Sequence, residues 1–305
     1  MQQITLLGPL SVEIDLKVKE AASLIGDAHI AKHSGIIFGG PALRIARLLR
    51  SIGYSVNICS YIGNDEFGNK ILENMKNEDI EHNTQKIPNI STPILCKLSD
   101  KKDYSYYITE TKDLALWQFR LKTLKDTGII YLAPSIPTPV QIDIVKQFKN
   151  STIIVRKPLD KSLELFKCQK KLIVLLNEYE VFQIFAEYER GYFYAEKILL
   201  LNLFKNHTVL LETRDAFCTM NLENKIVNIP LYNLRHNYAM MDEYCITGIL
   251  AALAGGQNHM NAFLWGLICS IQNGKNQPLN KLDILSKLTQ FTWIESIANS
   301  EPTES

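Results

Sequence analysis

Four groups of glycine, amide and carboxylate residues occur at spacings that could build a site for phosphate chemistry. Asp242 opens a predicted helix, and the start of a helix attracts anions through its free N–H groups. Asn177 and Glu180 follow a predicted buried strand and are three residues apart. The other two groups are the pair Gly39-Gly40 before a predicted helix and the segment 62–68, which reads Ile-Gly-Asn-Asp-Glu-Phe-Gly.

Each group also has a purely structural interpretation. Two glycines before a helix can form a tight turn. Asn177 and Glu180 have the spacing of a helix cap, in which each side chain bonds the backbone of the other residue. Asp242 can be a favourable anion near a helix start. The order and spacing of the four groups together, and not any one of them, indicate a function.

Other motifs are excluded by their details. The segment 63–70 has the two-glycine spacing of a P-loop, but its lysine is displaced by one position and no Ser or Thr follows. The sequence has no Gly-x-Ser-x-Gly elbow. His29 and His33 lie in a strand-like stretch, where a spacing of four does not converge on a metal, so they are expected on a polar face. The tyrosines within 104–107 could stack a ring, but a half-buried strand face is favoured.

The composition gives no sign of a nucleic-acid or membrane partner. The 305 residues are 46% hydrophobic and carry a net charge of +1, so no global field attracts an anionic partner. The six cysteines are dispersed without a Cys-x-x-Cys pair, as expected for free thiols in a reducing compartment. The first residues lack the basic region of a signal peptide, and no apolar run reaches the ~18 residues of a membrane span. A cytoplasmic protein is therefore expected.

Strands and helices are predicted to alternate along the chain. Strands are expected at 4–7, 56–62, 129–132, 153–155, 171–176 and 208–211, and helices at 42–52, 140–149, 242–253 and 261–272, with another starting at 178. Repeated strand–helix units predict an α/β fold with a mostly parallel sheet covered by helices on both faces. A single domain is expected over 1–298, followed by a disordered tail at 299–305.

Two segments do not fit this alternation. Residues of about 12–34 and 92–108 resemble antiparallel strands with one wet face. Together they are expected to form a small β lid beside the main domain.

The four groups, in this order, resemble the motifs of the ribokinase family, also called the PfkB carbohydrate kinases. The segment 62–68 is close to that family's G-x-D-x-F-G signature, Asn177 and Glu180 match its N-x-x-E motif, and Thr92-Pro93 resembles the start of its lid strand. The likeness runs from Leu6 to about Gly274. It implies a three-layer ribokinase-like sandwich that phosphorylates a hydroxyl of a sugar, nucleoside or vitamin alcohol with ATP and Mg²⁺.

The resemblance also implies roles for individual residues. Asp242 would be the general base, and Asn177 and Glu180 would support phosphate and Mg²⁺ through waters, with no direct metal ligand in the chain. Three further sets complete the site: the anion hole Ala239, Met240 and Met241; the acceptor-binding residues Glu13, Gly39, Gly40 and Arg44; and the nucleotide-binding residues Thr213 and Ala216.

The sequence departs from the family at several of these positions. Ala239-Met240-Met241 stands where the family has Gly-Ala-Gly before the Asp, so both glycines of the anion hole are lost. A misplaced oxyanion donor can cost ~10²–10³ in rate. The family's nucleotide-side Thr-x-Gly-x-x-Gly turn aligns with residues 211–216, where Thr213 and Ala216 stand in place of its two glycines. Arg44 replaces an Asn, Glu13 replaces an Asp, and Arg156 begins the segment that replaces an Asp-Pro-Asn-type strand end.

Three hypotheses follow. The first is a sugar or nucleoside kinase, possessing Asp242, Asn177 and Glu180 but impaired by the lost glycines. The second is a degenerate kinase-fold protein that acts as a ligand-binding or interaction subunit. The third makes the lid a homodimer interface, which is common in the family, and the chain mainly structural.

Overall fold

The computed structural model describes much of the chain, with gaps. The described residues are 2–17, 33–99, 105–108, 124, 126, 128–156, 164–177, 180, 204, 206–212, 217–222, 225–230, 243–274, 279–281, 284 and 294–297.

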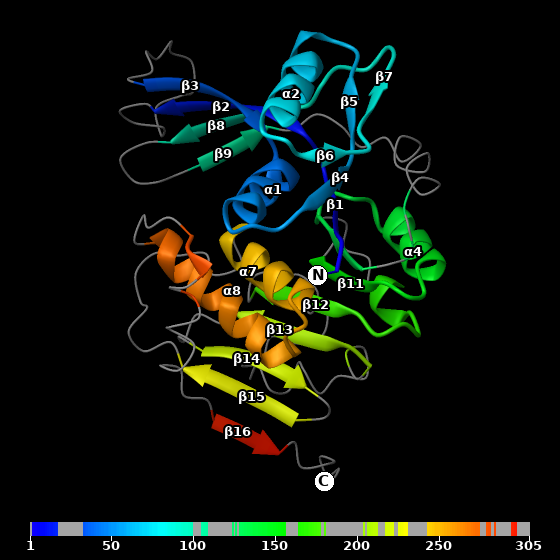
Figure 1. The fold of residues 1–305 in the computed structure, drawn as a ribbon, viewed down its shortest axis with the longest axis vertical. Helices are drawn as coiled ribbons and strands as arrows, with labels where there is room; N and C mark the ends of the chain where they lie inside the picture. The colour runs from blue at the N-terminus through cyan, green and yellow to red at the C-terminus, as the bar shows by residue number, and fades with distance from the viewer. Residues whose placement is uncertain are drawn as a thin grey trace.

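A ten-stranded sheet runs through the centre of the molecule (Figure 1). Seven of its strands are parallel, and in sheet order they are β13 Thr208–Glu212, β12 Ile173–Asn177, β11 Thr152–Arg156, β10 Ile129–Leu132, β1 Ile4–Leu7, β4 Val56–Cys59 and β6 Glu81–His82. Beyond β13 the sheet continues in antiparallel order through β14 Phe217–Leu222, β15 Lys225–Pro230 and β16 Ile294–Ile297. The predicted mostly parallel sheet is confirmed.

Helices cover both faces of the sheet. On one face lie α1 Pro41–Ser51, α7 Glu243–Ala254 and α8 His259–Gly274, and on the other lie α4 Thr138–Gln147 and the 3₁₀ helix η2 Glu164–Lys167 (Figure 1). Side chains alternate between the two faces of the sheet and so belong to two hydrophobic cores. Leu6 and Tyr131 pack against the first set of helices, and Leu7 and Leu132 pack against the second. The predicted three-layer α/β sandwich is therefore confirmed.

The small lid sheet is also present. It has the strand order β3-β2-β8-β9, with β2 Ser11–Lys17, β3 His33–Gly39, β8 Ile94–Ser99 and β9 Ser105–Ile108. The β2–β3 and β8–β9 pairs are antiparallel as expected, but β2 and β8 pair in parallel. The lid therefore joins two segments distant in sequence along parallel strands, which local patterns do not reveal.

Several predicted element boundaries are shifted in the structure, two of them with a clear cause. The strand expected at 56–62 is interrupted at Ser60, after which β5 Tyr61–Gly63 leaves the central sheet and pairs with β7 Gln85–Ile87. The helix expected at 140–149 begins at Thr138 and ends at Gln147, because Pro139 is compatible with the first helical turn.

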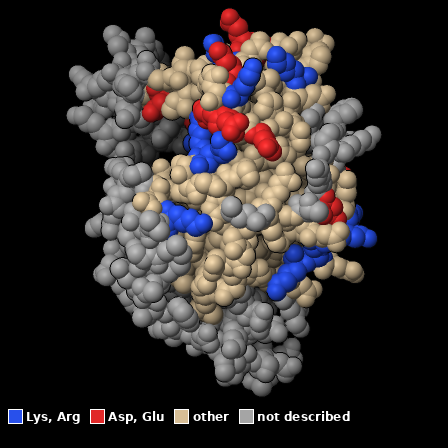
Figure 2. Space-filling view, viewed as in Figure 1, with Lys and Arg blue, Asp and Glu red and all other residues tan. Residues whose placement is uncertain are grey.

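Ion pairs at the surface join α1 to the end of α2 Glu66–Asn77. Arg47 pairs with Glu78 at 2.6 Å and Arg50 pairs with Asp79 at 2.9 Å. Figure 2 shows acidic and basic side chains side by side in this region. Asp79 is almost fully exposed, so the Arg50–Asp79 pair contributes little to stability.

No helix in the described part of the chain is long and apolar enough to cross a membrane. The single-domain boundary at 298 stays a prediction, and the tail at 299–305 lies outside the described residues.

Candidate active site

The glycine pair before α1 forms the turn that starts this helix. Gly40 has a φ of 95°, and a Cβ placed on it would lie 2.5 Å from the carbonyl oxygen of Pro9. Only glycine tolerates both conditions without strain. Gly39 has no such contact. The tight-turn interpretation therefore holds at Gly40, whose N–H donates to Glu13 Oε1 at 3.2 Å.

Arg44, one turn into α1, joins two acidic residues from other elements. Its Nη1 donates to Glu13 of the lid strand β2, while its Nε and Nη2 donate to Glu243 Oε1 at 3.2 and 2.7 Å. Burial alone would lower the pKa of Arg44, but the carboxylates of Glu243 and Glu13 outweigh it and raise that pKa. The structure thus brings Glu13, Gly40 and Arg44 together. Their role in binding an acceptor stays a prediction.

Glu243 was missed by the sequence analysis. It is the first residue of α7 and directly follows Asp242 in the chain. The available signal was an acidic residue in the first turn of a helix, which is a common stabilising feature and does not by itself indicate a site.

Asn177 and Glu180 form a reciprocal helix cap. The Asn177 N–H donates to Glu180 Oε2 at 2.8 Å, and the Glu180 N–H donates to Asn177 Oδ1 at 2.7 Å. The capping interpretation is confirmed. The second oxygen of Glu180, Oε1, accepts from Arg156 Nη2 at 2.8 Å.

The Arg156–Glu180 pair is largely buried. The side chains are 18% and 14% exposed, and Arg156 ends β11 while Glu180 follows the end of β12. Burial alone would lower the pKa of Arg156, but Glu180 raises it overall. This arginine therefore stays protonated, because its ordinary pKa is already far above neutral.

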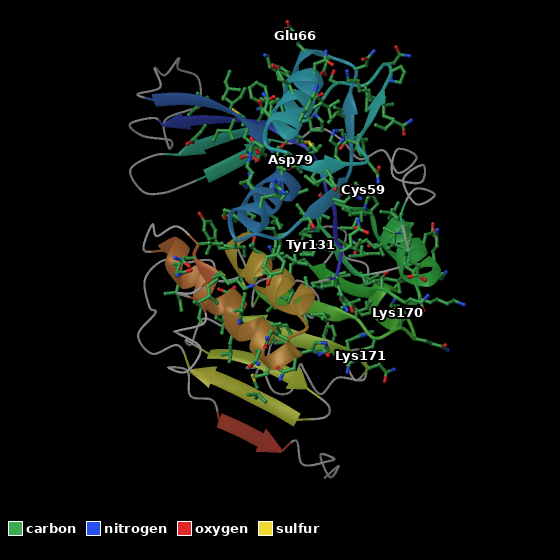
Figure 3. All side chains as sticks on the ribbon, in the orientation of Figure 1. Cys59, Glu66, Asp79, Tyr131, Lys170 and Lys171 are labelled. Carbon is green, nitrogen blue, oxygen red and sulfur yellow. The ribbon has the colours of Figure 1, made fainter. Side chains whose placement is uncertain are left out.

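Tyr131 is buried on β10, the strand beside β11. Figure 3 shows it on β10 near α7. Burial raises the pKa of its phenol; Arg156 opposes this, while Glu243 and Glu180 add to it. Both ion-pair groups are therefore within electrostatic reach of one buried side chain. The sequence indicates Tyr131 only as part of an apolar strand.

The G-x-D-x-F-G signature ties α2 to the start of lid strand β8. Asp65 caps α2 by accepting from the Gly68 N–H at 2.8 Å, and it also accepts from the Thr92 hydroxyl and N–H, both at 2.6 Å. Burial would raise the pKa of Asp65, but the bonds from Thr92 and Gly68 lower it overall. Thr92 Oγ1 in turn accepts from the Gly63 N–H at 3.1 Å. This signature therefore positions the lid.

Six predicted site residues lie outside the described part of the chain: Asp242, Ala239, Met240, Met241, Thr213 and Ala216. Their roles stay predictions. The adjacent described residues, Glu243 and Glu212, lie at the start of α7 and the end of β13.

The fold, the lid and the site at the carboxyl end of the sheet define the class of ribokinase-like α/β proteins. A sequence model of the pfkB family carbohydrate kinases matches residues 1–155, so the chain belongs to this family. No curated protein sequence matches.

Solved structures of low sequence identity share the fold. The ribokinase of Thermotoga maritima has a TM-score of 0.77 at 18% identity, covering 95% of this chain and 100% of that one. Phosphofructokinase-2 of Escherichia coli, in complex with fructose-6-phosphate, has a TM-score of 0.76 at 11% identity, covering 95% and 99%. The nucleoside kinase of Methanocaldococcus jannaschii has a TM-score of 0.74 at 14% identity, covering 95% and 99%. Family membership supports a function of the carbohydrate-kinase type.

The described residues do not fit the Mg²⁺ ion that the family implies. No group of three His, Cys, Asp or Glu side chains in the described ranges could hold a metal. Both oxygens of Glu180 are engaged, one of them by Arg156. The water-mediated contact that the family implies would need one of these two oxygens, and both already accept a hydrogen bond. A divalent cation held through such a water would also be repelled by the Arg156 guanidinium.

Proposed function

We propose that the chain transfers the γ-phosphoryl group of ATP to a hydroxyl of a sugar or nucleoside. The observation that supports this best is the meeting of Glu13, Arg44 and Glu243, since Glu243 directly follows Asp242 in the chain. A hydroxyl compound bound beside Glu13 and Arg44 would lie next to the start of α7. Family membership supports the same reaction class.

In the proposed reaction, the acceptor oxygen forms a bond to the γ-phosphorus, and the bond from that phosphorus to the β–γ bridging oxygen breaks. Asp242 takes the hydroxyl proton, and ADP leaves. The amides of Ala239, Met240 and Met241 hold the transferred group, and Thr213 and Ala216 lie on the nucleotide side. Catalysis then consists of positioning and charge stabilisation. The Mg²⁺ requirement stays an expectation from the family.

A second candidate is a kinase-fold subunit that binds a ligand without turnover. The observation that favours it is that two arginines already neutralise the acids of the site. Arg44 pairs with Glu13 and Glu243, and Arg156 pairs with Glu180.

The deciding experiment measures ADP release from the purified chain with ATP and a panel of sugars and nucleosides, beside the Asp242→Asn variant. The kinase proposal expects acceptor-dependent ADP release that falls by about 10²–10⁴ in the variant, because general-base catalysis is removed. A panel without acceptor-dependent release would contradict it and favour the second candidate.

We also propose that the lid forms a homodimer interface. Ile36 and Ile37 on the edge strand β3 are 60% and 47% exposed, and Ile94 at the start of β8 is 39% exposed. Ile36 and Ile94 lie on one face of the lid sheet and Ile37 on the other, because successive side chains of a strand alternate. Apolar side chains exposed on one face of a small sheet favour association with another surface. A cytoplasmic location stays a prediction.

A further inference from the structure

The guanidinium of Arg156 lies beside the carboxylate of Glu180, the acidic residue of the N-x-x-E motif. The Arg156 guanidinium lies 2.8 Å from Glu180 Oε1, and both side chains are largely buried. Glu180 Oε2 is held by the N–H of Asn177. The position of the Glu180 carboxylate is thus fixed by an arginine and by the backbone.

The Arg156 guanidinium lies at the carboxyl end of the sheet, where phosphoryl transfer is proposed to occur. Ile154 and Arg156 are two residues apart on β11 and so point to the same face, which is the face covered by α7. Tyr131 pairs with Ile154 on the neighbouring strand and packs in the same hydrophobic layer as Cys245 and Ile246 near the start of α7. Arg156 therefore lies on the face of the sheet that the start of α7 covers.

A guanidinium has chemistry suited to a polyphosphate. It is planar, permanently charged and carries five N–H donors that match the geometry of phosphate oxygens. A divalent cation at this position would have to compete with it for the same carboxylate.

We infer that Arg156 takes the place of the divalent cation at this site, so that the chain binds the triphosphate of ATP without a metal ion. The choice of ATP as ligand rests on the proposed function. The inference concerns binding, and it holds whether or not phosphoryl transfer follows.

The first test is calorimetric titration of the whole chain with ATP, once with EDTA and once with excess Mg²⁺. The affinity is expected to differ by less than about threefold between the two conditions. Titration of the chain with Mn²⁺ alone, followed by electron paramagnetic resonance, is expected to show no bound manganese. Manganese serves here as a probe with the oxygen preference of magnesium.

The second test reverses the charge at this position. Arg156→Asp is expected to create a carboxylate pair with Glu180 that binds Mn²⁺ and makes ATP binding depend on Mg²⁺ by about tenfold or more. The matched control is Arg50→Asp, which makes the same charge change in the exposed Arg50–Asp79 pair and should leave both titrations unchanged. Circular dichroism establishes that each variant is folded. If Arg156→Asp does not fold, Arg156→Gln serves instead, and it is expected to weaken ATP binding in EDTA.

The outcomes separate this inference from the proposed function. ATP binding by the wild-type chain only with Mg²⁺, or manganese binding by that chain, would overturn the inference and leave the kinase proposal standing. Metal-independent ATP binding without acceptor-dependent ADP release would support the inference and contradict the kinase proposal. ATP binding in neither condition would overturn the inference.

Discussion

Arg44 Nη2 lies 2.7 Å from Glu243 Oε1, although 199 positions separate the two residues in sequence. Through Nη1, Arg44 also donates a hydrogen bond to Glu13 of the lid strand β2. One side chain in the first turns of α1 therefore connects the lid to the helix that begins beside Asp242.

Removing this arginine should destabilise the fold. Arg44→Met leaves the partly buried carboxylates of Glu13 and Glu243 without their shared cation. Because the three side chains remain partly exposed, the expected loss is about 1–2 kcal/mol in the free energy of unfolding, measured by urea denaturation. Arg50→Met, in an exposed pair, should cost less than about 0.5 kcal/mol. Equal losses for the two variants would show that the Arg44 pairs contribute no more than a surface pair.

The turn at Gly40 should not accept a side chain. Gly40→Ala combines a φ of 95° with a Cβ placed 2.5 Å from the Pro9 carbonyl oxygen. The matched control is Gly53→Ala, because Gly53 has a φ of 87° but no atom within 4 Å of the added Cβ. We expect about 1–2 kcal/mol of destabilisation from backbone strain in the control and a clearly larger loss at Gly40, both from thermal unfolding. A Gly40→Ala variant as stable as the control would contradict the close approach to Pro9.

Stability should fall in mild acid through His207. The Leu172 N–H donates to Nδ1 at 3.3 Å, and Nε2–H donates to the Phe166 carbonyl at 2.8 Å, so the neutral ring is the form that fits. Burial lowers the pKa of His207 below its ordinary 6.5, although the bond to Phe166 partly opposes this. The unfolded chain then binds the proton more readily. The stability contributed by this residue is complete above pH ~6.5 and is lost below it, by up to about 1.4 kcal/mol per pH unit.

Urea denaturation over this pH range checks the prediction in the wild-type chain and in His207→Gln. The variant should lack part of the acid-dependent loss. Burial also lowers the pKa of His82, so His82→Gln is a useful comparison for a second histidine acting in the same direction. An unchanged pH dependence in His207→Gln would show that the ring accepts a proton as readily in the fold as in the unfolded chain.

The lid surface gives a prediction for association. If a second copy covers the lid face that carries Ile36 and Ile94, Ile36→Lys should place a charge in that apolar contact and separate the dimer. Light scattering after size exclusion should then report a dimer for the wild-type chain and a monomer for the variant. A wild-type chain that stays monomeric at all concentrations tested would contradict the lid interface.

Much of the fold could be predicted because its signals are local. Apolar runs such as 129–132 and helical spacing such as that of Ala42, Ile45 and Leu49 depend on neighbouring residues, and both appear as buried faces of the expected elements. The departure of β5 from the sheet after Ser60 and the parallel β2–β8 pair depend on contacts between distant segments. Those contacts leave no periodic pattern in the sequence.

The candidate site, too, could be predicted only where its residues are close together in the sequence. The residues of the capping pair Asn177 and Glu180 could be found because they are three positions apart. The partners of Arg44 and Arg156 could not, because an arginine that replaces an amide or an acid does not reveal which carboxylate it will meet. The resemblance to the family motifs indicates the substituted positions, and the new ion pairs are seen only in the structure.

The ion pairs of Arg44 with Glu13 and Glu243 also bear on the rate at which the lid could open. Any motion that takes β2 away from α7 must part the guanidinium from Glu13 or from Glu243, and both contacts are partly open to water. The Debye length is about 8 Å at physiological ionic strength, well beyond the 2.7 Å of the Arg44–Glu243 contact, so dissolved salt weakens these partly buried pairs only in part. In the proposed function, the release of a ligand bound beside the lid is therefore expected to be only modestly faster in concentrated salt.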